Sequence, residues 1–168
     1  MSDEIINRVA KSPIVSLDIA DYFSDDIEVI DIKPWLFQGL LLKEQEFRTS
    51  LAAHDWNIYS DKVVAVYCSA DAIVPQWAYM LIASYLDSLC TDYFFGSKEE
   101  VEEASLLKNI ASSSFEYCRD KPVIVKGCGN RPIPNSAYMA MVKKIKPLAK
   151  NIMFGEACSS VPIFKKKK

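Results

Sequence analysis

The sequence predicts an α/β fold in which a mainly parallel sheet is flanked by helices and built from two repeated strand-loop-helix-strand units. Short β-branched runs alternate with segments whose apolar residues recur at helical spacing, and this alternation occurs twice at a constant offset of 59 residues. Half of the 168 residues are apolar and 25% are charged, which is typical of a globular chain and excludes a disordered or fibrous one.

The sequence similarity between the two units is highest where residues 61–96 align with residues 120–155 without a gap. Of these 36 positions, 11 are identical, whereas about two identities are expected from ordinary composition. The identities include an Asp-Lys pair, a proline, an Ala-Tyr-Met triplet and a Phe-Gly pair. We therefore interpret the two segments as products of an internal duplication.

Each unit is predicted to run from a short buried strand through a loop and a helix to a returning strand. The first strands are expected at 63–67 and 123–126, and the returning strands at 93–95 and 152–154. Pro75 and Pro134 fit the first position of the two helices, where a missing N–H costs no hydrogen bond. Strands joined in this order through helices favour parallel pairing.

The remaining segments are expected to connect and flank these units. Residues 98–112 form a charged amphipathic helix between the units, and residues 43–54 form a helix before the first. Strands are expected at 14–17 and 29–32. Residues 35–42 are apolar throughout, so periodicity leaves both strand and helix open there.

The whole chain, residues 1–168, is expected to form a single domain, because no linker composition separates its parts. Residues 1–45 are interpreted as an N-terminal extension packed on the sheet. Residues 46–104 are then the first repeat unit, and residues 105–168 are the second unit with a basic tail.

The sequence favours a cytoplasmic protein. The segment Met1–Glu4 is acidic where a signal peptide is basic, and no stretch approaches the roughly 18 uncharged apolar residues of a membrane span. Five cysteines are an odd number, and we expect free thiols or ligands rather than a disulfide scaffold.

Three cysteines follow predicted strands at the carboxyl edge of the sheet, where α/β proteins collect their ligands. They are Cys68, Cys128 and Cys158, and the polar residues beside them are Ser69, Asp71, Asn130 and Ser159. Converging thiolates bind a soft divalent metal or an iron–sulfur cluster, and the polar neighbours are expected to orient them or add a ligand. The structural alternative is that each cysteine packs as a small hydrophobe, since the chain has no CxxC pair.

Conventional enzyme chemistry has little support in the sequence. His54 is the only histidine and is expected at a helix end, at the opposite edge of the sheet. Neither a dinucleotide-binding nor a P-loop motif is present. A metal-free enzyme with Cys128 as nucleophile is the weakest hypothesis, because no general base is placed beside that thiol.

The charge is unevenly distributed. Residues 1–119 carry 9 basic and 20 acidic side chains, whereas residues 120–168 carry 11 basic and 2 acidic ones. Lys143, Lys144 and Lys146 lie on one predicted helix. The alternative function is therefore a non-catalytic interaction module whose basic C-terminal face binds an acidic partner, or its own acidic body in a homodimer. Nucleic acid is disfavoured because aromatic residues do not interleave with these lysines.

Several segments resemble the bacterial family of domain of unknown function 2480 (DUF2480). They are Cys68–Pro75, Trp77–Leu81, Lys126–Cys128 and Phe154–Ser159, with Asp31–Lys33, Trp35–Phe37 and Leu42–Glu44 near the start. The resemblance brings no established activity. It implies a location close to iron–sulfur (SUF) assembly genes, and hence iron–sulfur assembly proteins as partners. We therefore expect an accessory protein in iron–sulfur cluster assembly or thiolate metal handling.

Overall fold

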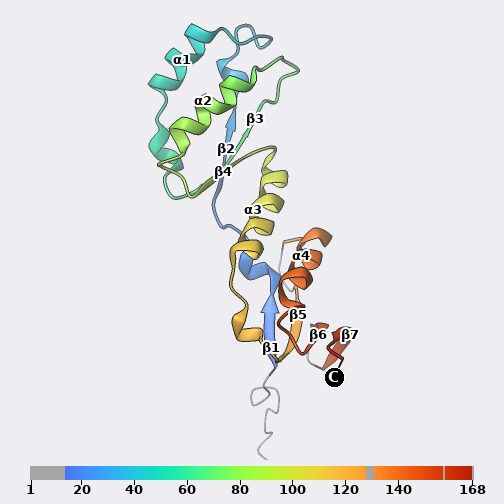
Figure 1. Cartoon of the computed structure of the whole chain (residues 1–168). Coiled ribbons are helices and arrows are strands. Elements are labelled where there is room, and N and C mark those ends of the chain that lie inside the picture. The colour runs from blue at the N-terminus through green and yellow to red at the C-terminus, as the bar shows by residue number, and fades with distance from the viewer. Residues whose placement is uncertain (1–13, 128–130, 157, 168) are drawn as a thin grey trace, which may run out of the picture. The chain divides into compact units, whose positions relative to one another are not determined.

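The chain is organised as two compact units (Figure 1). The computed structural model describes residues 14–127, 131–156 and 158–167. Unit 1 contains Met1–Phe23 and Leu106–Lys168, and unit 2 contains Ser24–Ser105. Each unit has its own sheet and its own buried core.

Unit 2 is a three-stranded parallel sheet in the order β2-β3-β4. Its elements are β2 (Ile27–Asp31), α1 (Glu44–Ala53), β3 (Val63–Tyr67), α2 (Gln76–Leu86) and β4 (Asp92–Phe95). Phe47 of α1 and Ile82 of α2 are fully buried against Val64 and Val66 of the central strand. All but the last residue of β3 are buried, and the strand is a continuous apolar run. This pattern is typical of a central strand in a parallel sheet.

The other face of this sheet is covered by the start of α3 (Lys98–Ser112), whose Val101 packs on Val63 and Ala65. This helix begins in unit 2 and ends in unit 1. Its second half supplies Leu106 and Ile110 to the core of unit 1. One amphipathic helix thus contributes to two cores.

Unit 1 is a four-stranded sheet in the order β1-β5-β6-β7. Its elements are β1 (Val15–Asp18), β5 (Pro122–Lys126), α4 (Asn135–Ile145), β6 (Asn151–Glu156) and β7 (Ser159–Lys165). The first three strands pair in parallel, and β7 folds back antiparallel onto β6. Met141 and Ile145 of α4 pack on Val123 and Val125 in the core.

Backbone geometry recurs between the units at the offset of 59. Val63 pairs with Asp92 in unit 2, and Pro122 pairs with Asn151 in unit 1. The amide of Asp61 donates to the carbonyl of Leu89 at 3.1 Å, and its counterpart, the amide of Asp120, donates to Leu148 at 2.9 Å. Both aspartates have a positive φ, 60° and 55°, which aspartate tolerates better than most residues.

The predicted α/β class is confirmed, with differences in how the sheet is assembled. The structure has two sheets where we expected one: β1 pairs with β5 in one sheet, and β2 pairs with β3 in the other. Residues 33–35 form a short 3₁₀ helix, and an isolated bridge between Phe37 and Leu41 follows. Among the described residues, no helix is both long and apolar enough to cross a bilayer.

The sequence predicts no strand after residues 152–154, and β7 is a further strand of the unit 1 sheet. Pro162 pairs with Met153 at a register shift, and β7 is an edge strand of its sheet. Proline is tolerated at an edge or a bulge because no inner neighbour needs its missing N–H.

Candidate functional site

Each unit has an apolar pocket beside its second helix, and the two pockets are built from equivalent positions. The pocket of unit 2 has a volume of about 290 Å³ and is lined by Val66, Tyr79, Met80, Ala83, Tyr93, Phe94 and Phe95. Each of these residues has a counterpart 59 positions later that lines the pocket of unit 1, which has a volume of about 440 Å³. Unit 1 adds Asn135 and, from β7, Ile163.

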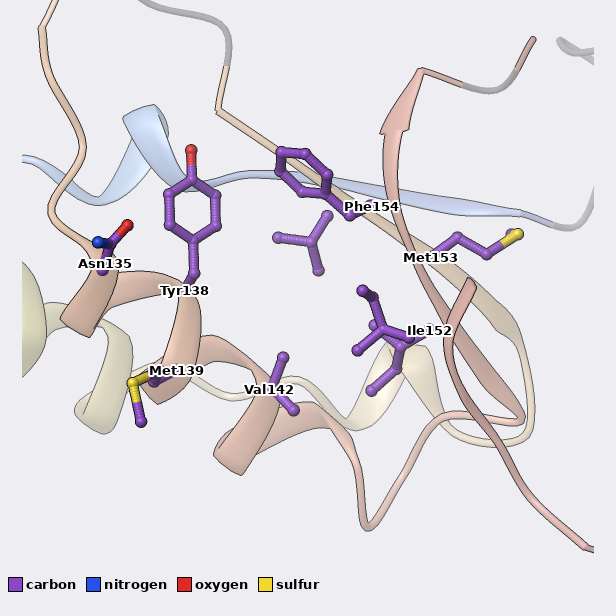
Figure 2. Close-up of a pocket in the computed structure, with 9 residues that line it drawn as sticks. Asn135, Tyr138, Met139, Val142, Ile152, Met153 and Phe154 are labelled. Carbon is purple, nitrogen blue, oxygen red and sulfur yellow. The ribbon is translucent and has the colours of Figure 1, made fainter. Parts of the chain in front are cut away.

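A tyrosine and a phenylalanine meet at each pocket. Tyr79 and Phe95 lie edge to face in unit 2, with ring centroids 5.3 Å apart and planes at 86°. Tyr138 and Phe154 repeat this arrangement in unit 1, at 5.7 Å and 81°. Figure 2 shows these two rings side by side, Tyr138 projecting from α4 and Phe154 from β6. Edge-to-face pairs stabilise by about 0.5–1.5 kcal/mol beyond the area they bury.

Large apolar side chains stay exposed around both pockets. Relative exposure is 72% for Met80 and 74% for Phe95 in unit 2, and 75% for Met139 and 42% for Phe154 in unit 1. None of the described lining residues is charged. Clustered exposed apolar groups mark interaction surfaces, and flexible methionines adapt to different partners.

At the carboxyl edge of the unit 2 sheet, Asp31 accepts hydrogen bonds that link the end of β2 to the loop after β3. Its carboxylate accepts from the amide of Ser69 at 3.0 Å, from the hydroxyl of Ser69 at 2.6 Å and from the amide of Lys33 at 3.0 Å. Burial acts to raise the pKa of Asp31, but these hydrogen bonds outweigh it and lower that pKa below 3.8. The two hydrogen bonds of Ser69 therefore attach the loop after β3 to the end of β2.

Cys68 is half-buried beside this loop, and its thiol donates to the carbonyl of Ala70 at 3.7 Å. Its counterpart in unit 1 is Gly127, where an added Cβ would meet the Tyr138 hydroxyl and Ile133. Because Gly127 has no side chain, the Tyr138 hydroxyl can lie against the end of β5. In unit 2, burial raises the pKa of the equivalent Tyr79, and the Cys68 sulfur raises it further.

The family model described as "Protein of unknown function (DUF2480)" matches residues 3–166. The chain belongs to the DUF2480 family. No curated protein and no solved structure matches it. The function of this DUF2480 protein is therefore argued from its own geometry.

The three cysteines predicted as ligands fall in different parts of the DUF2480 chain. Cys128 lies outside the described residues, as does Asn130. Cys158 is exposed in the turn between β6 and β7, and Ser159 begins β7. Cys68 belongs to unit 2 and Cys158 to unit 1, so joint ligation stays a prediction.

The other polar candidates are placed as follows. Asp71 is exposed in the loop after β3. Within the ranges described, no three His, Cys, Asp or Glu residues are grouped to hold a metal ion. Cys118 is fully buried, and burial raises the pKa of its thiol.

The lysines at and just after the C-terminal end of α4 make contacts within unit 1 of the DUF2480 chain. Lys144 donates to the carbonyl of Ala111 at 2.6 Å, and the Nζ atom of Lys146 lies 5.3 Å from the ring centre of Phe164. Lys143 is exposed. Over the whole sequence, unit 1 contains 15 basic and 7 acidic residues, a net charge of +8, whereas unit 2 contains 5 and 15, a net charge of −10.

His54 caps the C-terminus of α1, the position expected from the sequence. Its Nε2 atom lies 3.0 Å from the hydroxyl of Tyr59, and its ring packs edge-on against Trp35 and Trp56. The histidine is thus part of an aromatic cluster in unit 2.

Sequence reasoning missed Asp31 and both pockets. A signal for Asp31 existed, because Asp18 and Asp31 are each the last residue of a strand and each is followed by isoleucine. The repeated Tyr-Met pair and the repeated Phe indicated the pockets, but they were interpreted only as evidence of duplication.

Proposed function

We propose that this DUF2480 protein is a non-catalytic protein-interaction module that binds segments of partner proteins at its two equivalent pockets. The observation that carries the proposal is that seven matched positions line each pocket and keep methionine and phenylalanine exposed. Exposed apolar clusters of this kind are typical of interaction surfaces, and this chain presents the same cluster in both units. The linings are uncharged, and their polar side-chain groups are tyrosine hydroxyls and the amide of Asn135, which suit binding better than acid–base chemistry.

The opposite net charges of the units support two different partners. Unit 2, at −10, attracts basic segments, and unit 1, at +8, attracts acidic ones. Such charge complementarity governs association rate and partner choice more than affinity. A cytoplasmic location is part of the proposal, because the four described cysteines are free, as they are in a reducing compartment.

The test is quantitative co-purification from the native cells with matched variants. Met80→Ser with Phe95→Ser alters the pocket of unit 2, and Met139→Ser with Phe154→Ser alters that of unit 1. Ile58→Ser is the control, because Ile58 is exposed (49%) but lines neither pocket. Each pocket variant should lose a specific set of partners that the control retains. Identical partner sets in all four proteins would contradict the proposal.

Iron–sulfur assembly or thiolate metal handling is a second proposal, supported by one observation. The thiol of Cys158 is exposed at a hairpin turn, where a partner or a metal can reach it. Anaerobic purification followed by metal and labile-sulfide analysis tests it. Wild type should hold a stoichiometric metal that Cys128→Ser loses and Cys90→Ser keeps. A metal-free wild-type protein would contradict it.

A further inference from the structure

Two lysines follow the residues of α4 that line the unit 1 pocket. Figure 2 shows Val142 of α4 on one side of this pocket and Ile152 of β6 on the other. Lys143 lies four residues after Met139, and Lys146 lies four residues after Val142. Side chains at this spacing are neighbours on one helix face, about 6 Å apart along the axis. The spacing holds to the end of the helix, because the amide of Lys146 donates to the carbonyl of Val142 at 2.9 Å.

Both lysines keep their positive charge available to a partner. Within the described ranges, neither forms an ion pair with a carboxylate. The Nζ atom of Lys146 lies 5.3 Å from the ring centre of Phe164, an attraction that leaves the charge in place. Lys143 is exposed. Glu116 borders the same surface hollow as Lys143, but its carboxylate is paired with Arg119 at 2.6 Å.

The equivalent positions of unit 2 carry no positive charge. Ser84 stands in the place of Lys143, and Asp87 stands in the place of Lys146. The carboxylate of Asp87 accepts from the hydroxyl of Tyr93 at 3.1 Å, and Tyr93 lines the unit 2 pocket. The two pockets therefore share an apolar lining but have opposite charges at one matched position.

We propose that the unit 1 pocket binds an acidic segment of a partner protein, which inserts an apolar side chain beside Met139 and Phe154 and pairs its carboxylates with Lys143 and Lys146. This inference rests on the proposed function and names the chemistry of the partner at unit 1. An extended segment spans about 3.3 Å per residue, so carboxylates about two to four residues from the apolar side chain reach the lysines. Such charge complementarity selects partners and speeds association.

A second copy of this chain is a poorer occupant. Its acidic unit 2 has an equivalent pocket of about 290 Å³ at the matching place. Tight interfaces are packed as densely as protein interiors, and two facing hollows leave such an interface unfilled. A segment with a projecting apolar side chain fills the pocket.

The probe is a fluorescent peptide of sequence EEDSLFSDEE, in which a Leu-Phe pair lies between two acidic arms. Its binding to the full-length protein is measured by anisotropy. The wild type should bind this peptide, and added salt should weaken binding because charges are screened. The neutral peptide QQNSLFSNQQ and the peptide EEDSSSSDEE, which lacks the apolar pair, should each bind more weakly by about tenfold or more.

Matched lysine variants test the charge contribution. Lys143→Ser with Lys146→Asp introduces the residues of unit 2 and should weaken binding by about tenfold, because two ion pairs are lost and a repulsion is added. Lys121→Ser with Lys150→Asp is the control, since it changes the net charge equally at exposed lysines that line neither pocket. The control should keep its affinity within about twofold of the wild type.

Matched phenylalanine variants locate the apolar contact. Phe154→Ser should weaken binding by about tenfold, as loss of an anchor residue does. Phe95→Ser, the same change in the unit 2 pocket, should leave binding unchanged. Circular dichroism of each variant checks that it is folded.

The outcomes separate this inference from the function on which it rests. If EEDSLFSDEE does not bind, or if both lysine pairs weaken its binding equally, the inference is wrong. If the peptide fails while Met139→Ser with Phe154→Ser still removes co-purifying partners, the interaction module stands without this partner chemistry. A dimer of the free protein that Lys143→Ser with Lys146→Asp dissociates would assign the pocket to a second copy and overturn the proposal.

Discussion

The ring of Phe95 stands edge-on to the ring of Tyr79 at 5.3 Å, yet Phe95 remains 74% exposed. The contact orients the exposed ring without burying it. Phe95→Ala should therefore lower the free energy of unfolding by less than about 1 kcal/mol, because little buried area is lost. Phe47→Ala, at a fully buried position, should lower it by about 3–5 kcal/mol. Urea unfolding measures both, and a cost at Phe95 as large as that at Phe47 would show that Phe95 is a core residue.

Asp31→Asn should weaken the carboxyl edge of unit 2. The variant keeps the size of the side chain but loses charge-assisted acceptors for Ser69 and Lys33, at a cost of about 1 kcal/mol. Because the pKa of Asp31 is lowered by folding, its stabilisation is present above pH 3.8 and is lost as the pH falls through the folded-state value. The wild type should approach the variant in stability at low pH. A difference that stays constant from pH 7 to pH 3 would contradict this assignment.

Gly127→Ala should destabilise unit 1. The new methyl group would collide with the hydroxyl of Tyr138 and with Ile133, and overpacking of this kind costs about 1–3 kcal/mol. Adding Tyr138→Phe removes the hydroxyl and should restore part of the loss. Thermal or urea unfolding of the single and double variants measures the coupling. Additive effects of the two changes would mean that the Tyr138 hydroxyl does not limit residue 127.

Thiol labelling should follow the exposure of the cysteines. Cys158 is exposed, Cys68 is half-buried, and Cys118 is fully buried with a pKa raised mainly by burial. Iodoacetamide should therefore modify Cys158 first and Cys118 last in the folded protein, with all thiols reacting alike in urea. Peptide mass spectrometry gives the order. Early labelling of Cys118 would show that the core of unit 1 opens readily.

Local patterns predicted the elements well, because the forces that form them are local. Residues 63–67 form a strand as expected, and the helix predicted at 98–112 has those bounds. Strand pairing depends on contacts between residues far apart in the chain, so periodicity did not show that β1 joins β5 while β2 joins β3. For the same reason, two separate sheets were read as one.

The candidate site was predicted only in part. Reasoning from reactive side chains selected Cys68 and Ser69, which lie at the carboxyl edge of the unit 2 sheet as expected, but it did not identify Asp31, the hydrogen-bond partner of Ser69. The exposure of Met80 and Phe95 depends on what covers them, and sequence spacing carries no such information. Their counterparts, Met139 and Phe154, could be recognised as pocket residues only once both units were compared in three dimensions.

Methionine methyl NMR tests the central claim most directly, because Met80 and Met139 occupy matched places in the two pockets. When a partner protein that co-purifies with the wild type is added, the methyl signal of Met80 or of Met139 should shift in a saturable manner while that of the buried Met141 stays in place. A titration that leaves the signals of both Met80 and Met139 unchanged would contradict partner binding at the two pockets.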